Sequence, residues 1–284
     1  MTQEERASRP KITVRTIREM KPRGEKIVSL TAYDYPTARL VDEGGADLIL
    51  VGDSLGMVVL GYDSTIPVTL SEIVHHLKAV LRAQPRALVV ADLPFMTYQA
   101  SPEDAVRSSG RLVKRGAEAV KLEGGRRMLP QIQAILAADI PVMGHLGLTP
   151  QSVHQFGGYR VQGRGREAAD ALMEDALALE RAGCFSLVLE GVPLELGKEI
   201  TEALRIPTIG IGAGIHCDGQ VLVLHDLVGL TFEKPAKFVR RYTEAGDAIR
   251  GAITSFRDDV RAGRYPSVDE SYTAATGKRV ESKP

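Results

Sequence analysis

The stretch Leu48–Asp53, LILVGD, is a short apolar run that ends in a carboxylate, and the chain repeats this pattern three times. ALVVAD ends at Asp92, AVKLE at Glu123 and SLVLE at Glu190. Apolar runs of this length are typical of buried strands, and an acid at the end of a buried strand is costly unless it has a partner. Four such acids predict a shared cation or a proton-transfer site at one end of a sheet.

Eight apolar, β-branched segments alternate with segments that carry helix signals. Thr69 with Glu72 forms a capping box, Ser101-Pro102 is an N-cap followed by proline, and Thr149-Pro150 repeats that pattern. The expected strands are Lys26–Tyr33, Asp47–Asp53, Ala87–Leu93, Ala119–Glu123, Pro141–His145, Phe185–Glu190, Pro207–Ile211 and Val221–His225.

Eight strands alternating with helices in about 250 residues predict an α/β fold, a (β/α)8 TIM barrel. The rival is a doubly wound open sheet, which would have fewer strands and a glycine-rich fingerprint after the first one, where this chain has TAYDYPTA. The stretch VLVLHDLVGL around the last expected strand fits a helix equally well.

The composition is that of an ordinary globular protein without a basic excess. The 284 residues include 36 basic and 36 acidic ones, so nothing attracts nucleic acid or anionic lipid across the whole surface. The two cysteines, Cys184 and Cys217, give neither a disulfide framework nor a zinc spacing, which favours a reducing compartment. We find no signal-like apolar segment and no run of 18 apolar residues, so we expect a cytoplasmic protein outside the membrane.

Domain boundaries follow from the same composition. We expect a polar N-terminal extension over residues 1–10, one catalytic barrel over 11–265 and a flexible tail over 266–284, where apolar residues are few.

Strand alternation groups the polar strand-end residues by face. Each shares a face with the residue two positions before it. The pairs are Asp53 with Val51, Asp92 with Val90, Glu123 with Lys121, His145 with Met143 and Glu190 with Val188. This parity is consistent with all of these polar groups entering the lumen, although it does not identify the inward face.

Asp53 and Asp92 are candidate ligands of Mg²⁺, which takes one or two carboxylates together with water and substrate oxygens. The alternative is that each caps a helix or pairs with a basic residue. Lys121 and Glu123 are either a substrate-binding or metal-binding pair or a buried ion pair that braces the barrel. A Schiff-base role for Lys121 is disfavoured, because a neighbouring carboxylate keeps the amine protonated.

Glu190 lies in an apolar segment and is a candidate general base, or alternatively a capping residue. His145 is a candidate catalytic proton or hydrogen-bond partner, although a lone strand-end histidine is also common as a structural residue. We expect His75 and His76 on a helix and His154 in a loop, without a catalytic role.

Two glycine-rich stretches lie elsewhere in the chain. Ile209–Gly214, IGIGAG, lacks the full spacing of a nucleotide fingerprint and predicts a tight strand-to-helix turn. Phe156–Arg166, FGGYRVQGRGR, predicts a mobile loop that is either a lid over the site or a connector.

The motifs occur in a familiar order. They are TAYDYPTA, VGDSLGMVVLGYDSTIPVTL, ADLPFM, VKLEGG, GHLGLTPQSV, GGYRVQGR, LVLEGVP and IGIGAG. With them the chain resembles the ketopantoate hydroxymethyltransferase family over roughly residues 11–265. The resemblance implies a phosphoenolpyruvate/pyruvate-type barrel with a short N-terminal helix, Mg²⁺, a homodecamer and 5,10-methylenetetrahydrofolate as co-substrate. The implied reaction converts 3-methyl-2-oxobutanoate to ketopantoate through a Mg²⁺-stabilised enolate, which opens pantothenate synthesis.

The same resemblance implies a division of roles among the candidate residues. Asp53 and Asp92 would be metal ligands that also meet the substrate, and Glu123 a third acid of the metal site, directly or through water. Ser54 and Lys121 would contact the oxo acid. Glu190 would be the proton acceptor.

The sequence is also compatible with two other functions. One is a Mg²⁺-dependent, enolate-forming lyase or mutase of the isocitrate-lyase/phosphoenolpyruvate-mutase type, several of which use a cysteine in a mobile loop, and Phe156–Arg166 contains none. The other is a non-catalytic ligand-binding barrel. Retention of four strand-end acids and Lys121 argues against that second reading, since such residues are costly when they do nothing.

Overall fold

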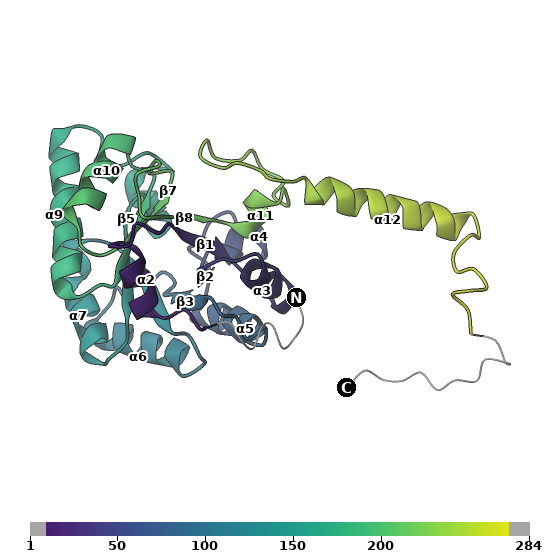
Figure 1. The fold of residues 1–284 in the computed structure, drawn as a ribbon, viewed down its shortest axis with the longest axis horizontal. Helices are drawn as coiled ribbons and strands as arrows, with labels where there is room; N and C mark the ends of the chain where they lie inside the picture. The colour runs from purple at the N-terminus through teal and green to yellow at the C-terminus, as the bar shows by residue number, and fades with distance from the viewer. Residues whose placement is uncertain (1–9, 273–284) are drawn as a thin grey trace.

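The structure, a computed structural model, describes residues 10–272, and in it eight parallel strands close into a barrel in sequence order (Figure 1). The strands are β1 (Ile27–Thr31), β2 (Leu48–Val51), β3 (Leu88–Asp92), β4 (Ala119–Glu123), β5 (Val142–Gly147), β6 (Ser186–Glu190), β7 (Thr208–Ile211) and β8 (Gly219–Leu222). The predicted TIM barrel is therefore confirmed.

Helices cover the outside of most of this barrel (Figure 1). The helices of the described residues are α2 (Val14–Met20), α3 (Tyr35–Glu43), α4 (Leu55–Val58), α5 (Leu70–Leu81), α6 (Pro102–Val113), α7 (Leu129–Ala137), α8 (Val153–Phe156), α9 (Arg166–Ala182), α10 (Leu194–Ala203), α11 (Leu224–Leu227) and α12 (Ala245–Arg261), with single 3-10 turns η1 (Arg126–Met128) and η2 (Pro150–Ser152). None of the helices within residues 10–272 is long and apolar enough to cross a membrane.

The predicted helix starts have different outcomes. The capping box of Thr69 and Glu72 begins α5, and Ser101 caps α6 through the backbone N–H of Asp104. Thr149 begins only the turn η2 and makes no side-chain cap. The expectation that His154 lies in a loop was wrong, because the chain continues from η2 into the single helical turn α8.

The lumen of the barrel has an apolar floor. Every strand contributes a buried residue to one cluster, and α2 closes its end with Ile17 and Met20. The strand residues of this cluster are Ile27, Leu48, Leu50, Leu88, Val90, Ala119, Met143, Val188, Ile209 and Val221. This cluster confirms the predicted N-terminal helix and identifies the inward face for β3, β4, β5 and β6.

The parity argument was wrong for Asp53. Its partners Ile49 and Val51 belong to the outer core between the strands and the helices, whereas Leu48 and Leu50 face the lumen. Asp53 lies beyond the end of β2, where the chain turns at Gly52 toward α4, so strand alternation no longer applies to it. A turn, rather than strand alternation, directs this carboxylate.

The last strand was also predicted wrongly. It is Gly219–Leu222 rather than Val221–His225, and His225 lies in α11. Gly219 pairs with Ile27 of β1, and a Cβ atom at this glycine would lie 2.5 Å from the carbonyl oxygen of Ile27. The strand thus begins at a residue whose missing side chain permits close approach, which an apolar pattern does not reveal.

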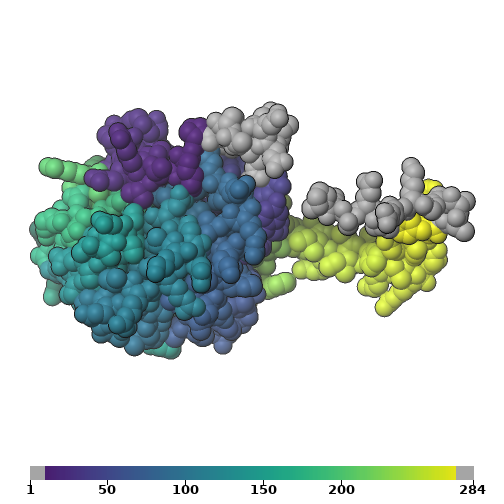
Figure 2. All heavy atoms as spheres, turned by 90° about the horizontal axis from the view of Figure 1, so that it is seen from below, coloured from purple at the N-terminus to yellow at the C-terminus, as the bar shows by residue number. Residues whose placement is uncertain are grey.

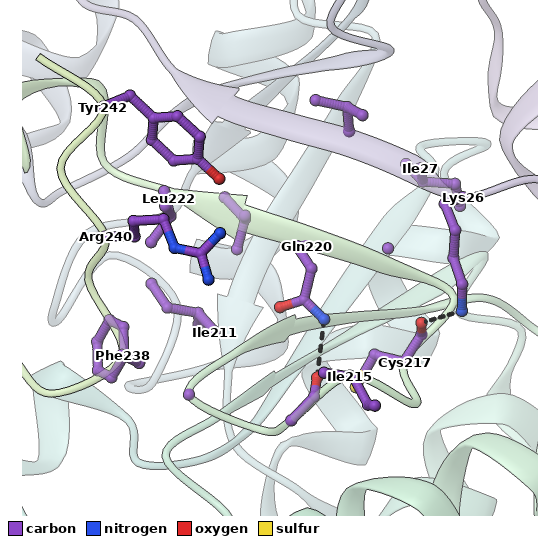
Figure 3. Close-up of a pocket in the computed structure, with 15 residues that line it drawn as sticks. Lys26, Ile27, Ile211, Ile215, Cys217, Gln220, Leu222, Phe238, Arg240 and Tyr242 are labelled. Atoms are coloured by element: carbon purple, nitrogen blue, oxygen red, sulfur yellow. Dashed lines mark hydrogen bonds between the residues drawn. The ribbon is translucent and has the colours of Figure 1, made fainter. Parts of the chain in front are cut away.

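One side of the barrel wall is less covered than the rest. Strands β2 to β5 are buried along their whole length, whereas the second residues of β1 and β8, Val28 and Gln220, are exposed. Val28 keeps 49% of its surface accessible. A groove of about 540 Å³ lies on this side, between the segment with Phe238 and Tyr242 and strands β7, β8 and β1 (Figure 3).

The helix α12 does not cover this groove. It extends away from the barrel, and none of its residues is buried (Figures 1 and 2). Figure 2 shows this segment standing off from the rounded body of the molecule. The expected extension and tail lie largely outside the described residues, so the predicted domain boundaries stay predictions.

Candidate active site

Six of the seven predicted site residues are charged or ionisable and gather at the carboxyl ends of β2 to β6. Asp53, Asp92, Lys121, Glu123 and His145 are each at most 5% exposed. Glu190, at the end of β6, is half-buried beside them. Hydrogen bonds and ion pairs join them into one network, so the convergence predicted from the strand ends is present.

Asp92 and Lys121 form the first contact of the network. They are paired residues on the adjacent strands β3 and β4, and Lys121 Nζ lies 3.0 Å from Asp92 Oδ1. The backbone N–H of Asp53 donates to Asp92 Oδ2 over 2.9 Å. Gly52 makes this approach possible, because a Cβ atom there would lie 3.3 Å from Asp92 Oδ2 and 3.0 Å from Ser54 Oγ.

The buried acids outnumber the positive charges next to them. Burial, followed by the charges of Asp92 and Glu123, raises the pKa of Asp53 well above its usual range. Burial also raises the pKa of Asp92, although Lys121 opposes this effect. For Lys121, burial disfavours the ammonium, but the surrounding carboxylates together raise its pKa. A second positive charge in this cluster would therefore be stabilised.

His145 joins the metal-side acids to Glu190. Its Nδ1 lies 3.5 Å from Glu123 Oε1, and its Nε2 lies 3.3 Å from Glu190 Oε2. Burial and Lys121 lower the pKa of His145, but Glu123 and Glu190 outweigh them and raise it to about 9. Lys121 Nζ is also 3.2 Å from Nδ1, a contact that would need a neutral ring. We favour the charged ring, because two carboxylates face it against one ammonium.

Ser54, the seventh predicted residue, lies beside the carboxylates at the start of α4. Its hydroxyl shares a 2.8 Å hydrogen bond with Tyr33, a fully buried residue that follows β1. His76 on α5 bonds through Nδ1 to the carbonyl oxygen of Tyr33 over 2.7 Å. His76 lies on a helix as predicted, and through this bond it supports the wall of the site. Tyr33 was not predicted as a site residue.

Two further residues, Gln151 and Tyr98, were also missed. Gln151 follows β5 in the turn η2, and its side-chain amide donates to Asp53 Oδ2 over 2.8 Å. Its backbone N–H donates to Glu123 Oε2 over 3.0 Å. Tyr98 accepts the backbone N–H of Glu123 over 3.1 Å. Both are uncharged residues outside the strands, and only the motif GHLGLTPQ contained a signal for Gln151.

The prediction for Ile209–Gly214 was only partly right: the chain turns tightly after β7, but it leads into β8 without a helix between them. The mobility of Phe156–Arg166 stays a prediction. Gly212 and Gly214 have positive φ angles, as a tight turn after β7 requires. Tyr159 in the other stretch donates to Met57 Sδ over 3.9 Å, which brings this loop to α4. Burial, together with the charge of Glu190, raises the pKa of Tyr159. The loop therefore lies near the mouth of the barrel.

The oxygen atoms of the buried acids are the kind of ligand that a hard cation such as Mg²⁺ prefers. Among the residues described, no three His, Cys, Asp or Glu side chains converge closely enough to chelate a metal by themselves. Two carboxylates from successive strands, in a cluster with excess negative charge, do fit Mg²⁺, which keeps water or substrate oxygens in its remaining positions. Asp53 and Asp92 fit this role, and Glu123 lies in the same cluster.

Comparison with known proteins gives a consistent result. The family model described as ketopantoate hydroxymethyltransferase matches residues 11–268. A protein of Moorella thermoacetica named 3-methyl-2-oxobutanoate hydroxymethyltransferase is 57% identical over 94% of this chain and 99% of its own length. A protein of Syntrophus aciditrophicus with the same name is 56% identical over 92% of this chain and 97% of its own.

Solved structures resemble the chain in fold. A phosphonopyruvate hydrolase complexed with oxalate and Mg²⁺ superposes with a TM-score of 0.60 at 13% identity, covering 93% of this chain and 92% of that one. A 2,3-dimethylmalate lyase, described as a PEP mutase/isocitrate lyase superfamily member, gives 0.59 at 17% identity with 93% and 92% coverage. At this identity the likeness shows the barrel fold alone.

Proposed function

The chain belongs to the ketopantoate hydroxymethyltransferase family, and we propose that it transfers a hydroxymethyl group from 5,10-methylenetetrahydrofolate to 3-methyl-2-oxobutanoate. The product would be ketopantoate, the first intermediate of pantothenate synthesis. The observation that carries this proposal is the placement of Glu190 next to a cluster of buried acids and Lys121 at one barrel mouth.

Mg²⁺ is the proposed metal, with Asp53 and Asp92 as its ligands and Glu123 as a supporting acid. When bound, it would act as a Lewis acid and stabilise negative charge on the oxo acid, an effect worth several kcal/mol. The excess of buried carboxylates supports this assignment, since their charge is poorly compensated without a dication.

The protein's own residues would bind the oxo acid and handle its proton. Lys121, held as an ammonium by Asp92, would attract the substrate carboxylate and stabilise charge that develops during enolisation. Ser54 would donate a hydrogen bond to the same substrate. Glu190 would accept the C3 proton, and His145, 3.3 Å away, would hold that carboxylate in place.

The atoms and protons of the hydroxymethyl transfer balance with water as the one additional reactant. As the C3–H bond breaks, its electron pair forms the new carbon–carbon bond to the methylene group of the folate. The two carbon–nitrogen bonds of that methylene group break, and water supplies the hydroxyl oxygen. The C3 proton and one proton of water then end on the two nitrogens of tetrahydrofolate.

The two alternative functions have less support. The solved lyase and mutase structures share only 15–17% sequence identity with this chain, whereas relatives with 54–57% identity carry the transferase name. A non-catalytic barrel gives no reason to keep five buried charged or ionisable residues together, because such groups reduce stability unless they are compensated.

An assay of 3-methyl-2-oxobutanoate with Mg²⁺ and the folate donor tests the proposal. We expect product that depends on both, together with exchange of the C3 proton into deuterated water without the folate. Full activity in the presence of a chelator would refute the metal assignment, and absence of turnover with all components would refute the reaction.

We also propose that the protein is a cytoplasmic homo-oligomer, and a decamer by resemblance to its family. The free face of α12 supports assembly: Ile249, Ile253, Phe256 and Val260 recur at helical spacing, and Ile253 is 62% exposed. An exposed apolar stripe of this kind is typical of a contact surface.

The proposed occupant of the groove beside β8 and β1 is α12 of a second copy. The groove is lined by apolar side chains such as Ile211, Leu222 and Phe238, with Gln220 and Arg240 among them (Figure 3). It lies on the barrel wall where a helix following β8 would normally pack, and the chain's own α12 points elsewhere (Figure 1). If two copies exchanged their α12 helices, both the apolar stripe of α12 and the groove beside β8 and β1 would be covered.

Light scattering of the Ile253→Asp variant tests the assembly. We expect smaller particles than for the wild type, since a carboxylate would enter the contact. The matched control is Ser255→Asp on the opposite face of α12, which should keep the wild-type size. A monomeric wild type would refute the proposal.

A further inference from the structure

Gln151 is an uncharged residue that forms hydrogen bonds with two of the acids of the site. The side-chain amide donates to Asp53 Oδ2 over 2.8 Å, and the backbone N–H donates to Glu123 Oε2 over 3.0 Å. These acids belong to separate parts of the barrel, one after β2 and one at the end of β4. A single residue therefore fixes the spacing between them.

The orientation of this amide is set by its neighbours. Its nitrogen also donates to the carbonyl oxygen of Leu93 over 3.0 Å, and a carbonyl cannot donate in return. The amide oxygen lies 2.9 Å from Tyr98 Oη and 3.0 Å from Gln99 Nε2, both of which can donate. Gln151 is 5% exposed, so solvent has little access to these bonds.

The hydrogen bonds engage some carboxylate oxygens of the acids and leave others available to a ligand. Asp53 Oδ2 is held by Gln151, and Asp92 Oδ2 is held by the backbone N–H of Asp53. The remaining oxygen of Asp53 is the one left for a ligand. Rotation of the Asp53 carboxylate would break its bond to the Gln151 amide, so its orientation is fixed before a ligand arrives.

We propose that Gln151 is a positioning residue that fixes the orientation of Asp53 and its spacing from Glu123, and that divalent metal affinity depends on it. The proposal rests on the proposed function in that these acids form its metal site. Residues that orient metal ligands typically change affinity or activity by 10–100-fold when they are lost. Preorganisation of this kind acts through geometry rather than through charge, because the amide is neutral.

Titration of the full-length protein with Mn²⁺, followed by the paramagnetic signal of the free ion, tests this role without substrate. Gln151→Met keeps the side-chain length but removes both polar groups, and we expect Mn²⁺ to bind about 10–100-fold more weakly. The variant keeps its backbone N–H, so Glu123 stays restrained and the effect reports on Asp53. Gln99→Met is the matched control: Gln99 contacts neither acid, Tyr98 still donates to the amide oxygen of Gln151, and the Mn²⁺ affinity of this variant should stay near that of the wild type.

Gln151→Asn is a second variant that keeps the proposal testable if Gln151→Met does not fold. It retains an amide but withdraws it by one methylene group from Asp53, so it should fold and still lose affinity. Thermal unfolding of the metal-free proteins separates stability from binding. Wild-type Mn²⁺ affinity in a folded Gln151 variant would overturn this inference alone, whereas a wild type that binds no Mn²⁺ would overturn the metal assignment of the proposed function.

Discussion

The mouth and the floor of the barrel lumen are lined by residues of the same strands, yet their chemistry is opposite. At the floor, Leu48, Leu88 and Ile209 pack against α2 in an apolar cluster. At the mouth, two to four residues further along the strands, Asp92 and Glu123 lie buried among other charges. The floor lowers the free energy of the fold, while the mouth raises it, which points to selection of the mouth for chemistry.

The largest expected effect comes from a substitution at the mouth that leaves the packing alone. Glu190→Gln keeps the size of the side chain and removes the proton acceptor, so kcat should fall by at least about 10³-fold. Unfolding free energy should change by less than about 1 kcal/mol, because Glu190 is half-buried and glutamine can still bond to His145. Urea denaturation and deuterium exchange at C3 measure the two quantities. Wild-type exchange would contradict the role of Glu190.

The next effect tests the stability of the mouth itself. Lys121→Met removes the ammonium 3.0 Å from Asp92, and it should lower the unfolding free energy by about 3–5 kcal/mol, because buried carboxylates lose their counter-charge. Activity should fall as well. The measurement is urea denaturation at neutral pH in the presence of chelator. The loss should shrink at acidic pH, where the carboxylates become protonated, and a pH-independent loss would indicate a packing defect instead.

A cavity at the floor should lower the unfolding free energy and leave kcat nearly unchanged. Leu88→Ala deletes a fully buried lumen side chain, for which we expect a loss of about 2–5 kcal/mol in unfolding free energy. The kcat of the molecules that remain folded should stay close to that of the wild type, since no mouth residue is touched. Activity normalised to the folded fraction, measured below the melting temperature, tests this. A large fall in normalised kcat would show that floor and mouth are mechanically coupled.

The sequence predicted the strands and their charged ends well because both follow from short, regular patterns. Apolar runs between helix signals determined the closed barrel, and the acids at the strand ends were recognisable from their unfavourable position. The parity of β3, β4 and β5 was consistent with Asp92, Lys121, Glu123 and His145 facing the lumen, and the apolar floor of the structure identified that face. The grouping of these residues did not require the family resemblance, whereas the separate roles assigned to them did.

The errors arose where the chain leaves regular structure. Asp53 reaches the site through the turn at Gly52, and Gln151 through the turn η2, so neither follows the strand alternation. The projecting position of α12 was not predicted either, because an amphipathic helix has the same sequence pattern whether it covers its own barrel or another surface. Contacts between distant turns depend on the closed fold, which local patterns do not encode.

The smallest expected effect uses Cys184, which lies in the outer core just before β6, as a reporter of opening at the floor end. Burial raises the pKa of its thiol to about 12, so alkylation at pH 8 should require local or global opening. Glu190→Gln should label at nearly the wild-type rate, whereas Leu88→Ala should label faster in proportion to its lost stability. Mass spectrometry of labelled peptides distinguishes Cys184 from Cys217. Equal acceleration in both variants would mean that the mouth and the floor open together, since only a shared opening would expose Cys184 after a substitution at the mouth.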